Sequence, residues 1–141
     1  MKMDEKKQPG VIFRGVFIKS LNFNLNEAKK QPKPLRYSFG ANFEHAVSPD
    51  KKKMKATLTV NCMDGIKNPP FDLVVSIDGY FETAKEGNLS LKEYAKEMAP
   101  ALLMPFVREI IANITSRIPY PPILLPPINI HALLMRQKRL K

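Results

Sequence analysis

The sequence contains few of the residues from which active sites are usually built. It has one cysteine, Cys62, and two histidines, His45 and His131, in 141 residues. A single cysteine excludes an internal disulfide, and no histidine–cysteine cluster has the spacing of a zinc site. We expect both histidines to be solvated or hydrogen-bonded rather than catalytic. No glycine-rich loop opens a helix to bind phosphate, so we predict neither an enzyme, a metal site nor a cofactor.

Long hydrophobic runs are also missing. Proline or charge interrupts every apolar stretch well before the ~18 residues that a membrane-spanning helix needs. The charged start of the chain, Met1–Lys7, is followed by no apolar segment of the kind found in a signal peptide. These absences predict a cytoplasmic protein.

Negative charge is scarce relative to positive charge. Lys and Arg number 23 and Asp and Glu 13, which gives a formal net charge of +10. The excess is concentrated at the N-terminus, at Lys51–Lys53 and at Arg136–Lys141. Basic proteins favour acidic partners, so a nucleic-acid- or ribosome-associated adaptor is an open alternative, although no known nucleic-acid motif accompanies the charge. At this length we expect one domain, residues 1–141, with flexible basic ends at 1–9 and 137–141.

Alternating apolar and polar residues predict four β-strands in the first part of the chain. Residues 11–25 form an extended pattern whose apolar face changes along its length, which indicates a β-bulge. Residues 35–43, 54–62 and 71–78 alternate as half-buried strands do. Short turns rich in Pro, Asp, Asn and Gly separate these last three strands. The pattern predicts an antiparallel sheet with one apolar face.

The hydrophobic period changes to that of a helix after residue 90. Ser90 and Glu93 form the capping-box pattern that starts a helix, and we expect this short helix to end near Met98. Pro100 suits the first turn of a second, long helix. The predicted apolar stripe of the long helix consists of Leu103, Phe106, Val107, Ile110, Ile114 and Ile118. Asn129 can cap a short C-terminal helix, and the whole pattern predicts the α+β class.

A proline-rich segment, Pro119–Pro127, joins the last two helices. Its five prolines in nine residues exclude a helix or a central strand and favour an extended, polyproline-like conformation. This segment cannot bury all its apolar side chains against itself, and together with the C-terminal helix it can wall an apolar groove. The predicted groove residues are Tyr120, Ile123, Leu124, Leu125, Ile130, Leu133, Leu134 and Met135. The alternative is that these residues pack over the sheet as core.

The C-terminal third of the sequence resembles the SecB family of export chaperones. Three segments carry the resemblance: Leu103–Glu109, Ser116–Pro121 and Leu125–Leu133. They match a Leu-x-Pro-x-x-Arg-Glu helix, an aromatic–Pro pair, and a Leu-x-Pro-Val-Asn-Phe segment before the last helix. Ile118 stands where the family usually has glycine, and Ile130 where it usually has phenylalanine. The upstream strands fit the family without a large insertion.

The resemblance implies a single SecB-like domain with a four-stranded antiparallel sheet, a long helix and a short C-terminal helix. It also implies assembly into a homotetramer, a dimer of dimers. The implied function is that of an ATP-independent chaperone, which binds unfolded polypeptides through apolar grooves and serves protein export or the protection of an antitoxin.

A partner-docking surface departs from the family pattern. The export members of the family dock the SecA motor through acidic residues on the sheet. The matching positions in this chain are Ser20, Asn24 and Lys67, and the acidic tail of many members is replaced by Gln137–Lys141. We therefore expect SecA docking to be weak or absent.

Overall fold

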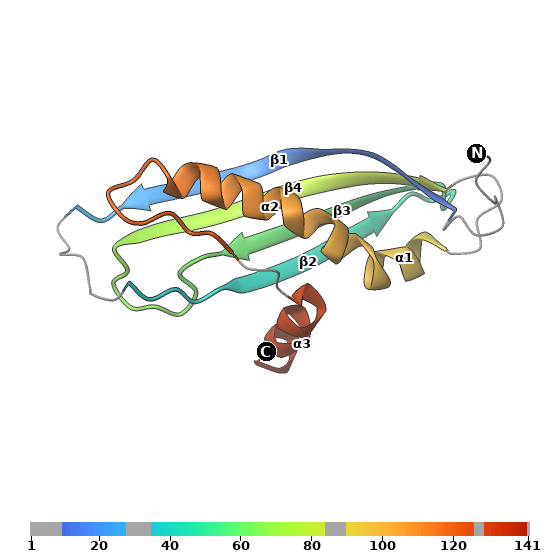
Figure 1. Cartoon of the computed structure of the whole chain (residues 1–141). Coiled ribbons are helices and arrows are strands. Elements are labelled where there is room, and N and C mark those ends of the chain that lie inside the picture. Colours follow the sequence, from blue (N-terminus) through green and yellow to red (C-terminus); the bar gives the residue numbers. More distant parts are fainter. Residues whose placement is uncertain (1–9, 28–34, 84–89, 126–128, 141) are drawn as a thin grey trace, which may run out of the picture.

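The computed structural model describes residues 10–27, 35–83, 90–125 and 129–140, which form one antiparallel sheet and three helices (Figure 1). The strands are β1 (Val11–Leu25), β2 (Gly40–Val47), β3 (Lys53–Asn61) and β4 (Phe71–Thr83). They lie in the order β1-β4-β3-β2, so the consecutive strands β1 and β2 form opposite edges of the sheet. The expected four-stranded antiparallel sheet is confirmed. Alternation alone does not specify the strand order.

The first strand contains the irregularity that its changing apolar face predicts. Its register with β4 shifts between Phe13 and Gly15 and again between Ile18 and Ser20, as in β-bulges. The ring of Phe13 therefore lies on the helix-covered face, with its centroid 5.2 Å from that of buried Phe81. The ring of Phe17 lies 5.9 Å from that of exposed Tyr80. The bulges thus divide the apolar side chains of β1 between the two faces of the sheet.

Several strand boundaries differ from the sequence prediction: β2 ends at Val47 rather than at Phe43, and β3 is shifted by one residue at each end. β2 begins at Gly40 rather than at Leu35, because the preceding segment pairs elsewhere. The N–H of Ser38 donates to the carbonyl of Cys62 at 3.2 Å, and its carbonyl accepts from Asp64 at 2.7 Å. β4 continues past Asp78 to Thr83, because pairing with β1 and β3 on its two sides extends that far.

The helices begin where the capping signals predict. They are α1 (Leu91–Glu97), α2 (Ala99–Thr115) and α3 (Ile130–Leu140). Ser90 Oγ accepts a hydrogen bond from the N–H of Glu93 at 3.2 Å, and Pro100 lies in the first turn of α2. Because α3 reaches Leu140, residues 137–140 of the basic end that we predicted to be flexible are helical. Residues 1–9 and 141, the rest of the two predicted ends, lie outside the described residues.

Helices α1 and α2 cover one face of the sheet, and the hydrophobic core lies between these helices and the sheet (Figure 1). Leu103 and Val107 of the predicted stripe are buried there, together with Ile111, which the predicted stripe omits. α2 approaches β4 very closely at Gly79, where a Cβ atom would lie 2.6 Å from Leu103 Cδ2. The large side chains that are fully buried include Leu58, Phe71, Leu73, Ile77 and Phe81.

The opposite face of the sheet is polar at its centre. Thr57 Oγ1 donates to Asp78 Oδ1 at 2.5 Å, and the hydroxyls of Thr59 and Ser76 share a hydrogen bond of 2.8 Å. These cross-strand pairs satisfy polar groups that neighbouring strands bury. At its centre the sheet therefore has the one apolar face that the alternation predicts, whereas Phe17 of β1 and Tyr80 of β4 add exposed apolar surface to the opposite face.

No single helix among the described residues is long and apolar enough to cross a membrane. α1 and α2 have sufficient length and apolar content only when they are taken together, and they are bent by 52° where they meet. Most of the buried side chains of both helices belong to the hydrophobic core.

Candidate binding groove

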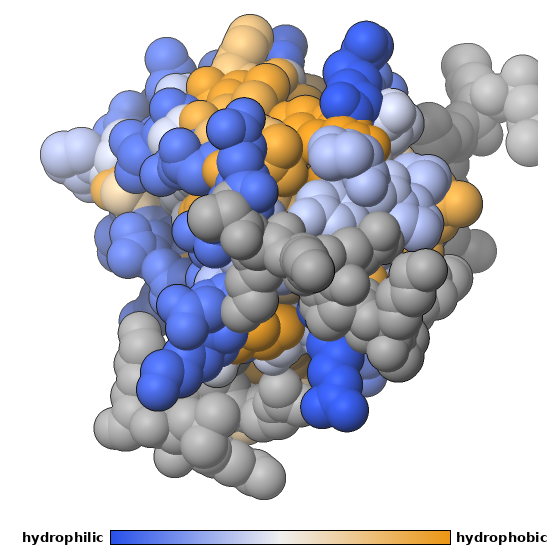
Figure 2. All heavy atoms as spheres, turned by 90° about the vertical axis from the view of Figure 1, so that its left-hand side faces the viewer, coloured by the Kyte–Doolittle hydropathy of each residue, from blue (hydrophilic) through white to orange (hydrophobic). Residues whose placement is uncertain are grey.

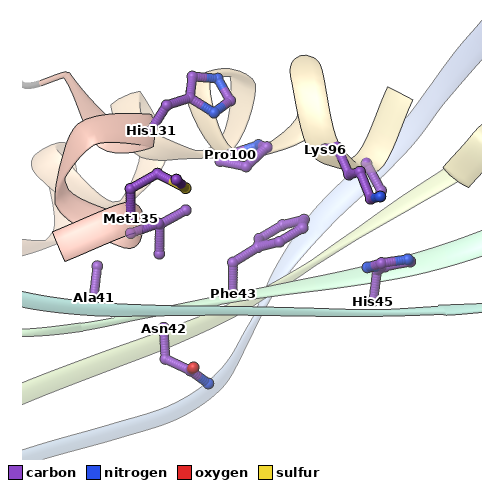
Figure 3. Close-up of a pocket in the computed structure, with 10 residues that line it drawn as sticks. Ala41, Asn42, Phe43, His45, Lys96, Pro100, His131 and Met135 are labelled. Carbon is purple, nitrogen blue, oxygen red and sulfur yellow. The ribbon is translucent and has the colours of Figure 1, made fainter. Parts of the chain in front are cut away.

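A cavity of about 410 Å³ lies between the edge strand β2, the junction of α1 and α2, and α3 (Figure 3). Its walls are mainly apolar and come from β2, from the consecutive helices α1 and α2, and from α3. The lining residues are Ala41, Asn42, Phe43, His45, Ala95, Lys96, Pro100, His131, Leu134 and Met135.

The floor of the groove is the helix-facing side of β2. Ala41, Phe43 and His45 alternate along the strand and point toward the helices, whereas Asn42 points away (Figure 3). This follows from the period of two in a β-strand. The rings of Phe43 and His45 are stacked, with centroids 6.1 Å apart. Because β2 is an edge strand and α2 lies over the middle of the sheet, the floor is left for α3 to cover.

The third helix closes the groove from the side. The side-chain oxygen of Asn129 accepts from the N–H of Ala132 at 3.1 Å, which confirms the predicted cap. Ile130 is buried, Leu134 is half-buried and Met135 is exposed. Leu134 and Met135 line the groove, whereas Ile130 belongs to the hydrophobic core.

Two hydrogen bonds attach Ile123 and Leu125 of the proline-rich segment to α2. Thr115 Oγ1 accepts from the N–H of Ile123 at 2.8 Å and donates to the carbonyl of Ile111 at 2.7 Å. Arg108 Nε donates to the carbonyl of Leu125 at 3.2 Å. The Arg108 of the family-like helix segment is therefore a structural residue here.

The proline-rich segment alternates between the core and solvent. Ile123 and Leu125 are 4% and 6% exposed, whereas Leu124 between them is 75% exposed. Tyr120 is partly buried, with its ring 5.7 Å from that of Phe71. Hydrophobic surface is also visible between hydrophilic side chains at the end of the molecule viewed in Figure 2.

The structure thus separates the predicted groove residues into groups, and Leu124 belongs neither to the cavity lining nor to the core. Leu134 and Met135 line the cavity. Ile123, Leu125 and Ile130 belong to the hydrophobic core, so the alternative of core packing applies to these three, while Tyr120 and Leu133 pack partly buried against it. Sequence reasoning missed the floor of the groove, although the alternation of Ala41 and Phe43 indicated that they share one face.

The chemistry of the groove is that of a binding surface. Cys62 lies elsewhere, completely buried at the end of β3, and burial raises the pKa of its thiol to about 12. It is therefore protonated and shielded at neutral pH. Among the described residues, no three His, Cys, Asp or Glu side chains lie close enough to hold a metal ion.

The three predicted partner-docking positions are all exposed. Ser20 and Asn24 lie on β1, opposite Ser76 and Asp72 of β4, and Lys67 lies in the turn before β4. The exposed carboxylate of Asp72 therefore lies beside Asn24 and places one negative charge on this surface. The sequence analysis did not include Asp72 among the docking positions.

The fold is α+β and the site is an apolar groove, and comparison with known proteins gives the family. A family model described as preprotein translocase subunit SecB matches residues 4–141. The chain belongs to the SecB family, as its resemblance predicts. This membership supports a chaperone function over the adaptor alternative.

Several relatives span most of the chain. The protein-export protein SecB of Anaplasma phagocytophilum is 28% identical, with 92% of this chain and 94% of that protein covered. The SecB of Anaplasma marginale (strain Florida) is 30% identical, with 92% and 83% covered. An uncharacterized protein of Methanocaldococcus jannaschii is 26% identical, with 92% and 85% covered.

One solved structure is similar in fold. It is a SecB-like chaperone from Mycobacterium tuberculosis in complex with a ChAD peptide from the HigA1 antitoxin. It aligns with a TM-score of 0.67 at 16% sequence identity, covering 84% of this chain and 88% of that one. This likeness confirms the predicted fold class.

Proposed function

We propose that this protein is a cytoplasmic, ATP-independent chaperone that holds unfolded polypeptides in the groove between β2 and α3. The observation that carries the proposal is the apolar cavity of about 410 Å³ in a chain of the SecB family. Secreted precursors or an antitoxin are the proposed clients. Holding a client in such a groove requires binding alone and no catalytic step.

The physical basis of holding is burial of apolar surface. Unfolded chains expose aromatic and aliphatic side chains, and burying these stabilises a complex by ~25 cal/mol per Å². Phe43 and Leu134 provide broad apolar walls, and Met135 provides a flexible one that adapts to different side chains. Contacts of this kind select for exposed apolar residues rather than for one sequence.

The test is suppression of aggregation. A client that aggregates on dilution from denaturant should stay soluble when an equimolar amount of this protein is present. Addition of ATP should not change the extent of client aggregation. Light scattering of the client at 0.15 M salt is the measurement. The proposal would be contradicted if the client aggregated equally fast with and without this protein, and if circular dichroism showed this protein to be folded.

We also propose a homotetramer. β1 is an edge strand among the described strands, and it exposes Phe17 (64%), Ile18 (54%) and Leu21 (45%). A long apolar edge is an aggregation hazard unless another chain covers it, and several grooves in one assembly would bind a long client with avidity. Light scattering at micromolar concentration should give four times the chain mass of 16.0 kDa. A stable 16.0 kDa monomer would overturn this proposal.

We propose that docking to SecA is weak or absent. The exposed positions Ser20 and Asn24 are uncharged and Lys67 is basic, whereas docking in export members depends on acidic side chains there. Like charges at an interface slow encounter and weaken binding. Calorimetric titration with the basic tail of the cognate SecA should show little heat at low salt. Tight, salt-sensitive binding that is lost in Asp72→Asn would instead identify Asp72 as the docking charge.

A further inference from the structure

The groove combines apolar walls with positive or polar nitrogen groups from three elements. His45 comes from β2, Lys96 from α1 and His131 from α3, and all three line the same cavity (Figure 3). Lys96 and His45 are exposed, and His131 is half-buried. No Asp or Glu is among the described residues that line it.

The carboxylates nearest in sequence do not belong to the groove. Glu44 is adjacent to His45, but strand alternation places it on the opposite face, where its Oε1 accepts from Asn42 Nδ2 at 3.4 Å. Glu93 and Glu97 flank Lys96 on α1 and do not line the cavity. Among the described residues, Lys96 makes no ion pair within 4.0 Å. Its charge is thus available to a bound chain.

We propose that the groove selects client segments in which an aromatic or aliphatic side chain lies within two residues of Asp or Glu. The inference rests on the proposed function and names the client class of the same site. The apolar side chain contacts Phe43, Leu134 and Met135, and the carboxylate reaches Lys96 and the two imidazoles. Hydrogen bonds to an ionised partner are stronger than neutral ones, whereas basic segments meet like charge.

The preference is local rather than a consequence of net charge. Screening limits the field of distant charges to about 8 Å at physiological salt, so most of the +10 net charge does not act inside the groove. Lys96 does act there, because it lines the cavity. Removing its charge should therefore matter more than removing an equal charge elsewhere on the surface.

Three fluorescent peptides test the inference on the full chain. They share one set of Phe and Leu residues, separated by Asp, by Gln or by Lys, and their binding is measured by anisotropy at 0.15 M salt. The Asp peptide should bind about tenfold more tightly than the Gln peptide, and the Lys peptide should bind most weakly. Lys96→Gln should bring the ratio of the affinities for the Asp and the Gln peptides close to one.

Lys67→Gln is the matched control, because it makes the same change in net charge at an exposed turn away from the groove. It should keep the preference for the Asp peptide. Equal binding of all three peptides would overturn the inference and leave the proposed function standing. Binding of none would overturn the proposed function itself. An equal loss of preference in both variants would show that the charge effect is not local, which also overturns the inference.

Discussion

Replacing Ile123 and Leu125 together with serine is expected to unfold the protein. Both side chains are almost completely buried in the core, and the backbone of each residue is hydrogen-bonded to a side chain of α2. Truncating a buried Leu or Ile to a small residue costs about 2–5 kcal/mol, and serine adds a hydroxyl in an apolar site. Two such losses approach the total stability of ~5–15 kcal/mol of a typical domain. Urea denaturation followed by circular dichroism measures the loss.

The serine substitution of Leu124 is the matched control. This residue lies between the two buried ones and is 75% exposed, so Leu124→Ser should change the free energy of unfolding by less than about 0.5 kcal/mol. If the double variant instead keeps the denaturation midpoint of the parent, the proline-rich segment is not part of the core. Its residues would then be free to bind clients, as the sequence alone suggested.

Combined substitution of Phe43 and Met135 by serine is expected to abolish most client binding while the fold is kept. Phe43 is half-buried on the groove floor and Met135 is 54% exposed on α3. Each side chain contributes about 1.5–3 kcal/mol when a bound chain buries it fully, and 1.4 kcal/mol is a factor of ten. The expected loss of affinity for an unfolded client is therefore at least about a hundredfold. Fluorescence anisotropy with a labelled, permanently unfolded client measures it.

The matched control for this pair replaces apolar residues outside the groove. Met98 and Leu124 are 46% and 75% exposed, and neither lines the cavity. Met98→Ser with Leu124→Ser should leave the affinity within about twofold, because surface substitutions away from a site change energies by ~0.5 kcal/mol or less. A greater loss of client affinity in the control than in the groove variant would indicate that clients bind at the proline-rich segment.

Local signals in the sequence predict most of the fold. Alternation gives the strands, the change of face in β1 gives its bulges, and Ser90 and Asn129 give two helix starts. These features depend on residues a few positions apart, so they can be recognised from the local sequence alone. The start of β2 is the exception, because Ser38 pairs with residues of a distant segment.

The groove depends on contacts between residues far apart in the sequence, so only part of it was predictable. Its floor on β2 is open because β2 is an edge strand, and strand order is not encoded in alternation. His45 and Lys96 join the site only through the placement of α1 over β2. In contrast, the burial of Ile123 and Leu125 could have been predicted, because an extended segment alternates and exposes Leu124 between them.

Methyl NMR of methionine tests most directly whether unfolded chains bind between β2 and α3. Met135 is at the groove, Met98 is exposed elsewhere, and Met54 and Met63 are buried in the core. Addition of an unfolded client without nucleotide should shift the Met135 methyl signal in a saturable manner and leave those of the other three in place. Saturable client binding with an unchanged Met135 signal and a shifted Met98 signal would contradict the account.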